Sequence, residues 1–259
     1  MQSHIPAPSD GLREVYERRA ELEYPAPVPA PDPALDRKFQ RVCELVAEQL
    51  PCDRYLDAGC GDGRYLAALA HLPARPERIA ATDISERILE VARTAAAEAG
   101  VAVEAARANL EALPYSDGSF DVVLCTQVIE HLLDPARGVS ELARVLAPGG
   151  RAVVTTDHRR NLVTKALNLP RTAAVRALGL RGRRAKVSFP HRDFGRDEVA
   201  RLARKAGLEV EHTETFRFTL LRPLDVKPAV RLLNMVDRRL GGRNVLGDLI
   251  AVVARKPGG

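Results

Sequence analysis

Residues 55–65 read Y-L-D-A-G-C-G-D-G-R-Y and place three glycines at alternate positions, Gly59, Gly61 and Gly63. The apolar residues before the glycines predict a buried strand, and the residues after them predict a helix. Glycine has no Cβ, so it permits a tight turn and lets a ligand approach the main chain closely. This stretch therefore predicts a strand, a glycine turn and a helix that hold a ligand against the backbone.

The charges around the turn indicate which ligand it binds. A dinucleotide-binding turn follows the pattern G-x-G-x-x-G and places a pyrophosphate at a helix N-terminus, but the third residue after Gly61 is Arg64. Asp57 and Asp62 would repel phosphate and favour a cation. S-adenosylmethionine carries a sulfonium and an ammonium, and its ribose offers two hydroxyls to an acid after the next strand, where Asp83 stands.

Further motifs follow the turn in a fixed order. They are R-I-A-A-T-D (78–83), N-L-E-A-L-P-Y-S-D-G-S-F-D-V-V-L-C-T-Q-V-I-E-H (109–131) and V-L-A-P-G-G-R-A-V-V-T-T (145–156). With these motifs the chain resembles the class I S-adenosylmethionine-dependent methyltransferases, a broad group that includes quinone-biosynthesis and natural-product methyltransferases. The resemblance covers about residues 53–156.

The resemblance implies S-adenosylmethionine as cofactor and assigns roles around the turn. Asp57 and the backbone amides of the glycine turn would hold the methionine part of the donor. Asp83, after the second strand, would hold the ribose hydroxyls. Asn109 stands where the family usually has aspartate, and an asparagine oxygen can equally accept a hydrogen bond from the adenine amino group. The implied cofactor-binding residues are Asp57, Gly59, Cys60, Gly61, Gly63, Asp83, Ile84, Asn109, Leu110 and Cys125.

The acceptor side is expected after the fourth strand, at Gln127, Glu130 and His131. His131 is the candidate general base, since imidazole is the side chain there that ordinarily titrates near neutrality. The alternative is that Glu130 and His131 cap the next segment or shape the pocket wall, because the family carries this pair irrespective of substrate. Some quinone-type relatives hold a metal with an acid at the position of Gln127, but glutamine is a poor metal ligand, so no metal is expected.

Four further residues are candidates for the acceptor pocket. Tyr16 and Tyr24 lie in an N-terminal segment that relatives often fold over the donor, which makes them lid candidates. His158 follows the fifth strand and His191 lies in F-P-H-R-D-F, so both are expected near the pocket mouth. Each could act in acid–base chemistry or serve as a polar rim residue.

Alternating strand and helix patterns predict an α/β fold with a doubly wound, mostly parallel sheet. The resemblance implies a seven-stranded, Rossmann-like methyltransferase sheet with an antiparallel closing strand. The expected strands are residues 53–58, 78–83, 101–106, 120–125, 151–156, 208–218 and 248–255. The expected helices are residues 34–49, 63–71, 85–99, 134–146, 196–206 and 225–240.

Two segments extend this predicted domain, which spans residues 36–259. Residues 1–35 hold seven of the 18 prolines, which predicts an extended arm or lid with a short helix at 12–24. The alternative for this segment is a flexible tail. Residues 157–192 interrupt the strand and helix alternation and predict a basic helical cap insertion.

The charge is divided unevenly along the chain. Residues 1–150 carry a net charge of −9 and residues 151–259 carry +14, while the whole chain has 33 Arg and 6 Lys. The codon usage of a GC-rich genome explains the preference for arginine but not this division. Residues 159–186 contain nine basic and no acidic residues, so we expect them to receive a phosphate or carboxylate, a carrier-protein surface or an anionic membrane face. The alternatives are a solvated surface and a dimer contact.

Cysteine usage and hydropathy indicate the cellular compartment of the protein. Cys43, Cys52, Cys60 and Cys125 show no paired or zinc-binding spacing, which predicts reduced thiols. No apolar run approaches the roughly 20 residues that span a bilayer, and the N-terminus lacks a signal-peptide pattern. These features predict a cytoplasmic protein.

The leading functional hypothesis is methyl transfer to an oxygen or nitrogen of a small or carrier-borne metabolite. RNA methylation is an alternative, but the chain has no Asn/Asp-Pro-Pro signature and no RNA-binding module, so no nucleic-acid partner is expected. A second alternative is a non-catalytic donor-binding partner protein. The acceptor and the oligomeric state are left open by the sequence.

Overall fold

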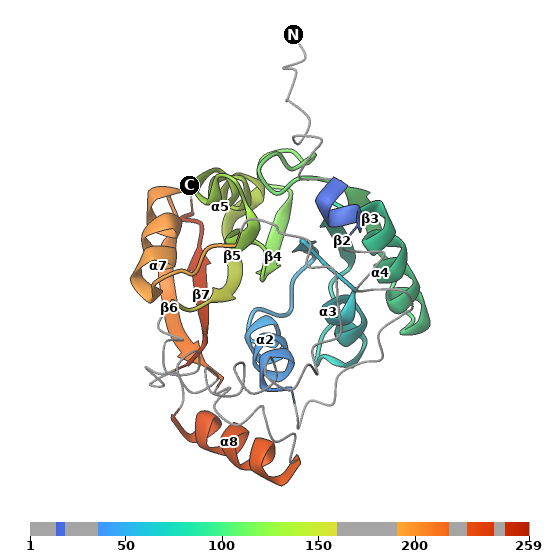
Figure 1. Ribbon diagram of the computed structural model, residues 1–259. Coiled ribbons are helices and arrows are strands. Elements are labelled where there is room, and N and C mark those ends of the chain that lie inside the picture. Colours follow the sequence, from blue (N-terminus) through green and yellow to red (C-terminus); the bar gives the residue numbers. More distant parts are fainter. Residues whose placement is uncertain (1–13, 19–35, 160–190, 218–226, 241–246, 259) are drawn as a thin grey trace.

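Seven strands form one sheet at the centre of the molecule (Figure 1). In chain order they are β1 Arg54–Ala58, β2 Arg78–Asp83, β3 Glu104–Arg107, β4 Phe120–Thr126, β5 Leu146–Asp157, β6 Glu209–Phe216 and β7 Leu249–Arg255. In space their order is β3-β2-β1-β4-β5-β7-β6. The computed structural model describes residues 14–18, 36–159, 191–217, 227–240 and 247–258.

The pairing of the strands confirms the predicted sheet. Strands β1 to β5 pair in parallel, and β7 runs antiparallel to both β5 and β6. Because β6 and β7 are antiparallel, β6 has the same direction as β5. The carboxyl ends of six strands therefore meet at one edge of the sheet, where the chain after β6 also emerges.

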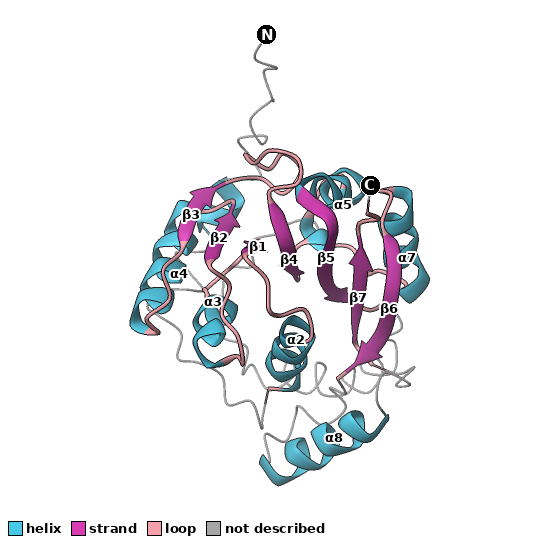
Figure 2. Ribbon diagram, turned by 180° about the vertical axis from the view of Figure 1, so that it is seen from behind, coloured by secondary structure: helices cyan, strands magenta, loops and turns pink. Residues whose placement is uncertain are grey.

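Helices cover both faces of the sheet (Figure 2). One apolar core holds side chains from α2 Arg37–Ala47, α3 Arg64–Ala68 and α4 Glu86–Glu98. The other holds side chains from α5 Pro135–Val145 and α7 Arg196–Lys205. Parallel strands that are covered on both faces are apolar along their whole length, as the buried run 122–125 of β4 shows.

Side-chain caps set where three helices begin. Asp36, Ser85 and Asp134 each accept a hydrogen bond from the backbone amide three residues later. Such caps satisfy amides that have no partner inside the helix. They fix the starts of α2, α4 and α5, and α4 and α5 begin at the carboxyl edge.

Several boundaries differ from the predicted ones. Strand β5 begins at Leu146 rather than 151, because Leu146 pairs with Phe120 and the Gly149 amide bonds to the Lys256 carbonyl at 2.9 Å. Helix α3 ends at Ala68 and continues as a 3₁₀ turn, Leu69–His71. These differences arise from pairing with distant segments, which local patterns do not report.

The predicted arm and insertion fall largely outside the described residues. Of the arm, residues 14–18 are helical, whereas Tyr24 lies outside the described part. Of the insertion, residues 160–190 lie outside it too. The division into arm, domain and insertion therefore stays a prediction.

Two further sequence expectations can be compared with the structure. All four cysteines are free thiols, as predicted. Among the described residues, we find no helix with the length and hydropathy needed to cross a membrane.

Candidate active site

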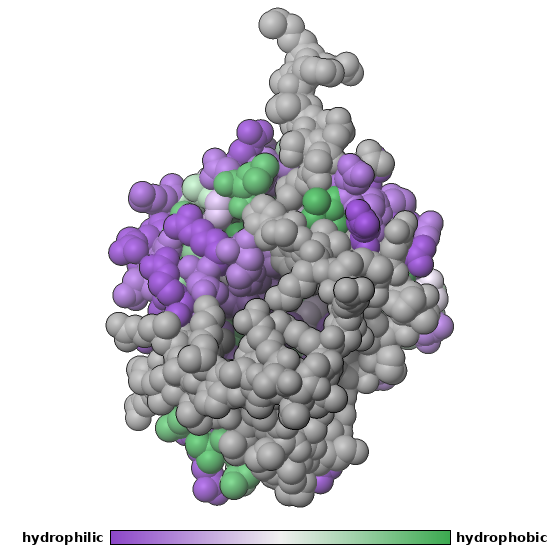
Figure 3. Space-filling view, viewed as in Figure 1, coloured by the Kyte–Doolittle hydropathy of each residue, from purple (hydrophilic) through white to green (hydrophobic). Residues whose placement is uncertain are grey.

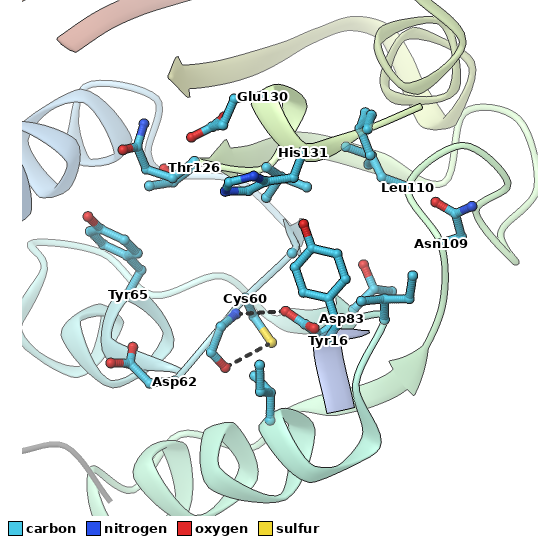
Figure 4. A pocket seen from close by; sticks show the side chains of 18 of the residues that line it. Tyr16, Cys60, Asp62, Tyr65, Asp83, Asn109, Leu110, Thr126, Glu130 and His131 are labelled. Carbon is cyan, nitrogen blue, oxygen red and sulfur yellow. Dashed lines mark hydrogen bonds between the residues drawn. The ribbon is translucent and has the colours of Figure 1, made fainter. Parts of the chain in front are cut away.

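A cavity of about 440 Å³ opens at the carboxyl edge of the sheet (Figure 4). Its volume falls in the range of small-molecule sites, about 300–1,000 Å³. The structure brings twelve predicted site residues together in its lining: Tyr16, Gly59, Cys60, Gly61, Asp83, Ile84, Asn109, Leu110, Gln127, Glu130, His131 and His191. They come from segments between residues 16 and 191, which the sheet gathers at one edge.

Glycine is required in the turn for two different reasons. Gly59, Gly61 and Gly63 have φ of +85°, +52° and +76°, where side chains are strained. A Cβ at Gly63 would lie 2.6 Å from the Ala92 backbone, so this glycine permits α3 to pack against α4. A Cβ at Gly61 would meet nothing within 4 Å, which agrees with its place in the cavity lining.

Asp83 holds the turn and faces the cavity. Its carboxylate accepts hydrogen bonds from the Gly61 and Ser85 amides, each at 3.1 Å. Burial raises the pKa of Asp83, while these backbone bonds oppose the rise. Each oxygen keeps a lone pair for a further donor, so the ribose hydroxyls predicted by the resemblance have acceptors here.

Asp57 belongs to the buried end of β1 before the turn and is not part of the cavity lining, so its contact with the methionine part stays a prediction. The side chain is buried, and neither carboxylate oxygen has a hydrogen-bond partner among the described residues. Burial, followed by the charges of Asp83 and Asp62, raises its pKa to about 8. A cation in the neighbouring cavity would offset this burial, so the site fits the charge of S-adenosylmethionine.

This carboxyl gives a pH-dependent prediction. Its folded pKa of about 8 lies above the ordinary value of 3.8, so the folded state keeps a proton that the unfolded chain releases. The contribution of Asp57 to the free energy of unfolding should therefore be fully present below pH 4. It should be lost as pH rises to 8, by up to about 1.4 kcal/mol per pH unit. In Asp57→Asn this contribution should disappear.

Urea unfolding of the ligand-free protein between pH 4 and 8 measures this effect. Glu130 titrates in the same direction, so the Asp57 contribution is the difference in slope between wild type and Asp57→Asn. The exposed Asp53→Asn is the matched control and should keep the wild-type slope. Equal slopes in wild type and Asp57→Asn would contradict the raised pKa.

The argument that Asp62 repels phosphate needs correction. The Arg64 guanidinium bonds to both Asp62 oxygens, at 2.5–3.1 Å. This pair offsets the charge of Asp62, since opposite charges at hydrogen-bond distance largely cancel. The acidic character of the turn therefore rests on Asp57 and Asp83.

Three other predicted residues also lie outside the lining. Gly63 packs on α4 as described above, and the Cys125 side chain belongs to the apolar core. His158 was expected at the pocket mouth, but it is buried and its Nδ1 lies 2.8 Å from the Gly247 carbonyl oxygen. Its backbone amide bonds to Asp248, which turns it toward the closing strand β7 and away from the pocket.

Lys38 is a lining residue that the sequence analysis missed. It belongs to the first turn of α2 and lines the cavity beside the glycine turn. Burial lowers its pKa first, and the charges of Arg217 and Arg64 lower it further. The only sequence signal was a rare lysine in an arginine-rich chain, so the topology was needed to find it.

The helical residues 14–18 close one side of the cavity. Both carboxylate oxygens of Glu17 accept hydrogen bonds at the start of α4, from the Ser85 hydroxyl at 2.8 Å and the Glu86 amide at 2.9 Å. Tyr16 lies between His131 and Asp83 in Figure 4 and meets the His131 ring edge-on, 6.2 Å between centroids. This segment is thus tied to the loop that follows Asp83.

The end of β4 supplies the other wall. Gln127 has φ of +57° and its side-chain nitrogen is buried without a partner among the described residues. Strain of this kind in a non-glycine residue occurs often at functional sites. Among the described residues, no cluster of three or more His, Cys, Asp or Glu side chains could hold a metal ion.

Glu130 is anchored rather than free in the cavity. Its Oε2 accepts a hydrogen bond from the Thr156 hydroxyl at 2.8 Å, and its carbonyl accepts from the Arg192 amide at 2.9 Å. Burial raises the pKa of Glu130 to about 8. These contacts fit the structural alternative for Glu130, and the bond from Arg192 also brings the neighbouring His191 to the cavity.

Two histidines meet at the cavity mouth as a result. The rings of His131 and His191 lie 5.3 Å apart between centroids. His191 Nε2 lies 3.6 Å from Asp157 and 3.5 Å from Asp193, in ion-pair range once the ring is protonated. The arrangement therefore places two imidazole rings and two carboxylates at the mouth of the cavity.

Comparison with known proteins agrees with this geometry. Residues 56–154 match the model of a methyltransferase domain. The ubiquinone biosynthesis O-methyltransferase of Ralstonia nicotianae is 37% identical over 60% of this chain and 63% of its own length. That of Xylella fastidiosa strain 9a5c is 31% identical over 68% of this chain and 69% of its own length. The chain thus spans slightly less than two thirds of the length of the first relative and slightly more than two thirds of the length of the second.

Solved structures share the fold. SpnF, a (4+2)-cyclase, has a TM-score of 0.66 with 23% identity, and the match covers 100% of both chains. An S-adenosylmethionine-dependent methyltransferase from Mesorhizobium loti has a TM-score of 0.57 with 21% identity, over 84% of this chain and 100% of that one. Since the order of motifs, the sheet, the cavity and these relatives agree, the chain belongs to the class I S-adenosylmethionine-dependent methyltransferases.

Proposed function

We propose that this protein transfers a methyl group from S-adenosylmethionine to an oxygen or nitrogen of a small-molecule acceptor. The observation that carries the proposal is that the donor-side acid Asp83 and the candidate base His131 line one continuous cavity. The ubiquinone biosynthesis O-methyltransferases among the relatives support an oxygen acceptor. The proposed acceptor is a free, anionic or carrier-borne small molecule, and the proposed setting is the cytoplasm.

Donor binding divides among three parts of the lining. Asp83 accepts the ribose hydroxyls, and Ile84 and Leu110 provide apolar contact for the adenine. Asn109 Oδ1 already accepts the Glu111 amide at 3.1 Å, but a carbonyl oxygen has a second lone pair for the adenine amino group. Lys38 supplies the cation that a carboxylate on the methionine part requires, since acids otherwise surround the turn.

The protein's own task is alignment and proton removal. S-adenosylmethionine, when bound, supplies a methyl group already activated by the sulfonium charge. The chain must hold the acceptor within about 3–3.5 Å and exclude water, which can account for much of the rate enhancement. Tyr16 and the helical residues 14–18 would cover the cavity on the side of the donor.

His131 would take the acceptor proton, with His191 beside it. The carboxylates of Asp157 and Asp193 lie near His191, so a proton passed outward would reside next to negative charge. His191 is exposed at the cavity mouth, which gives the proton a route to solvent. This arrangement favours a base role for His131 over a purely structural one.

Incubation of the purified protein with methyl-labelled donor and an extract of the encoding organism tests the function. Mass spectrometry should find the label on a small molecule or its carrier, and Asp83→Ala should lower labelling at donor concentrations that do not saturate the variant. Label on RNA would favour the RNA alternative. Donor binding without any labelled product would favour a non-catalytic partner protein. A direct assay is needed because a fold alone does not fix a reaction.

A further inference from the structure

Helix α8 Lys227–Leu240 turns Asn234 and Asp237 inward, beside the half-buried Val230 and Leu233, and leaves four large apolar side chains exposed. Asn234 and Asp237 are 5% and 2% exposed, whereas Leu232, Met235, Val236 and Leu240 are 57%, 37%, 39% and 39% exposed. Surface helices normally show the reverse arrangement. Neither of the two apolar cores of the described residues contains a side chain of α8.

Polar contacts hold α8 in this orientation. Arg37 Nε donates to Asp237 Oδ2 at 2.7 Å, and both side chains are buried. The Arg217 amide donates to the other Asp237 oxygen at 3.0 Å. A buried carboxylate with these partners would be costly to turn outward, so the apolar side is fixed toward solvent.

The outward side of α8 combines apolar and cationic residues. At 3.6 residues per turn, Leu232, Met235, Val236 and Leu240 form one stripe, Arg239 falls within it, and Arg231 and Arg238 lie along its flank. All three arginines are exposed, and the one acid of the helix, Asp237, faces inward. Figure 3 shows apolar green beside hydrophilic purple at the lower edge, where Figure 1 places α8.

Helix α8 lies at the same edge of the sheet as the cavity. The helix is inserted between the end of β6 and the start of β7, at the carboxyl edge where the cavity opens. Arg37, which holds α8, is the neighbour of the lining residue Lys38. A surface that docked on α8 would therefore approach the edge of the sheet that receives the acceptor.

We propose that α8 docks the protein on an anionic lipid surface. A stripe of apolar side chains flanked by arginines is the composition of helices that lie in the membrane interface. Anionic lipid attracts such cations, and the apolar side chains can enter the acyl boundary. A second copy of the same face would bring arginines against arginines, and a nucleic acid would leave the apolar stripe without a partner.

Sedimentation of the full chain with lipid vesicles tests the proposal. At 0.1 M salt the protein should bind vesicles of phosphatidylglycerol and phosphatidylcholine at least tenfold more tightly than vesicles of phosphatidylcholine alone. Raising the salt to 1 M should weaken binding, because the Debye length falls from about 10 Å to about 3 Å. Binding that is equal on both vesicle types, or absent, would overturn the proposal.

Two triple variants assign the binding to α8. Leu232→Gln, Met235→Gln and Val236→Gln together, and Arg231→Gln, Arg238→Gln and Arg239→Gln together, should each lower vesicle affinity at least tenfold. The matched control removes three exposed cations from α7, with Arg201→Gln, Arg204→Gln and Lys205→Gln. It should change affinity less than twofold.

Donor binding and circular dichroism show whether each variant is folded. Vesicle binding is measured without methyl transfer, so this test does not depend on the proposed activity. Equal losses in the α7 control and the α8 variants would overturn the assignment. So would a self-associated state or RNA binding that depends on α8 without any vesicle binding.

Discussion

Replacing His131 with alanine is expected to lower turnover by about 10²–10⁴-fold while donor affinity stays within about twofold of wild type. The reason is that His131 lines the cavity across from Asp83 (Figure 4), at the end where we propose that the acceptor binds. Its loss would remove the group that accepts the proton and leave the donor contacts in place. Single-turnover kinetics and calorimetric titration with S-adenosylmethionine measure the two quantities.

Controls separate proton transfer from wall packing. His71→Ala removes an exposed histidine outside the cavity lining and should leave turnover unchanged. If His131 is the base, the pH profile of turnover should differ between wild type and His131→Ala. Glu130, whose pKa burial raises to about 8, titrates nearby, so the profile should also be recorded in Glu130→Gln. A loss below about fivefold in His131→Ala would assign the residue to alignment alone.

Replacing Asp83 with alanine should weaken S-adenosylmethionine binding by about ten- to a hundred-fold, which corresponds to roughly 1.5–3 kcal/mol for a charge-assisted hydrogen bond. The structure predicts a second loss of affinity in this variant, in addition to the lost ribose contact. Asp83 also holds the amides of Gly61 and Ser85, so its removal loosens the turn as well as the ribose contact. The upper end of the range is therefore expected.

Calorimetric titration of the purified variant measures the loss. Asp83→Asn keeps an acceptor oxygen but not the charge, so its affinity should fall between wild type and alanine. The exposed Asp117→Ala, outside the cavity lining, is the control and should bind the donor normally. Unaltered affinity in Asp83→Ala would mean that the ribose is held elsewhere.

The sheet could be predicted because its determinants are local and repetitive. A short apolar run such as residues 120–125 predicts a strand, and a capped periodic segment such as residues 86–98 predicts a helix. Both patterns are contained within a few neighbouring residues. The parallel order then brings strand ends to one edge, which predicts that Asp83 and Gln127 lie together. Boundaries such as the start of β5 at Leu146 depend on pairing with Phe120, a partner 26 residues away.

The sequence could not state which side chains open into the cavity. Asp57, Asp62 and Asp83 look alike as acids near the turn, yet Asp57 is buried outside the lining, whereas Asp62 and Asp83 both line the cavity and Asp62 is paired there with Arg64. The direction of a side chain at a strand end depends on the pleat and on the neighbouring strand. His158 illustrates the same limit, because its partner Gly247 lies 89 residues away.

By itself, the sequence determined the family, the sheet and the segments that meet at its edge, because motif spacing and periodicity encode these directly. Only the tertiary structure placed Lys38 in the lining, brought His191 to His131 through the backbone bond from Arg192 to Glu130, and turned the apolar side of α8 outward. Each of these depends on contacts between segments tens to hundreds of residues apart. Such contacts are decided by packing and by the burial of charged groups, which no local pattern contains.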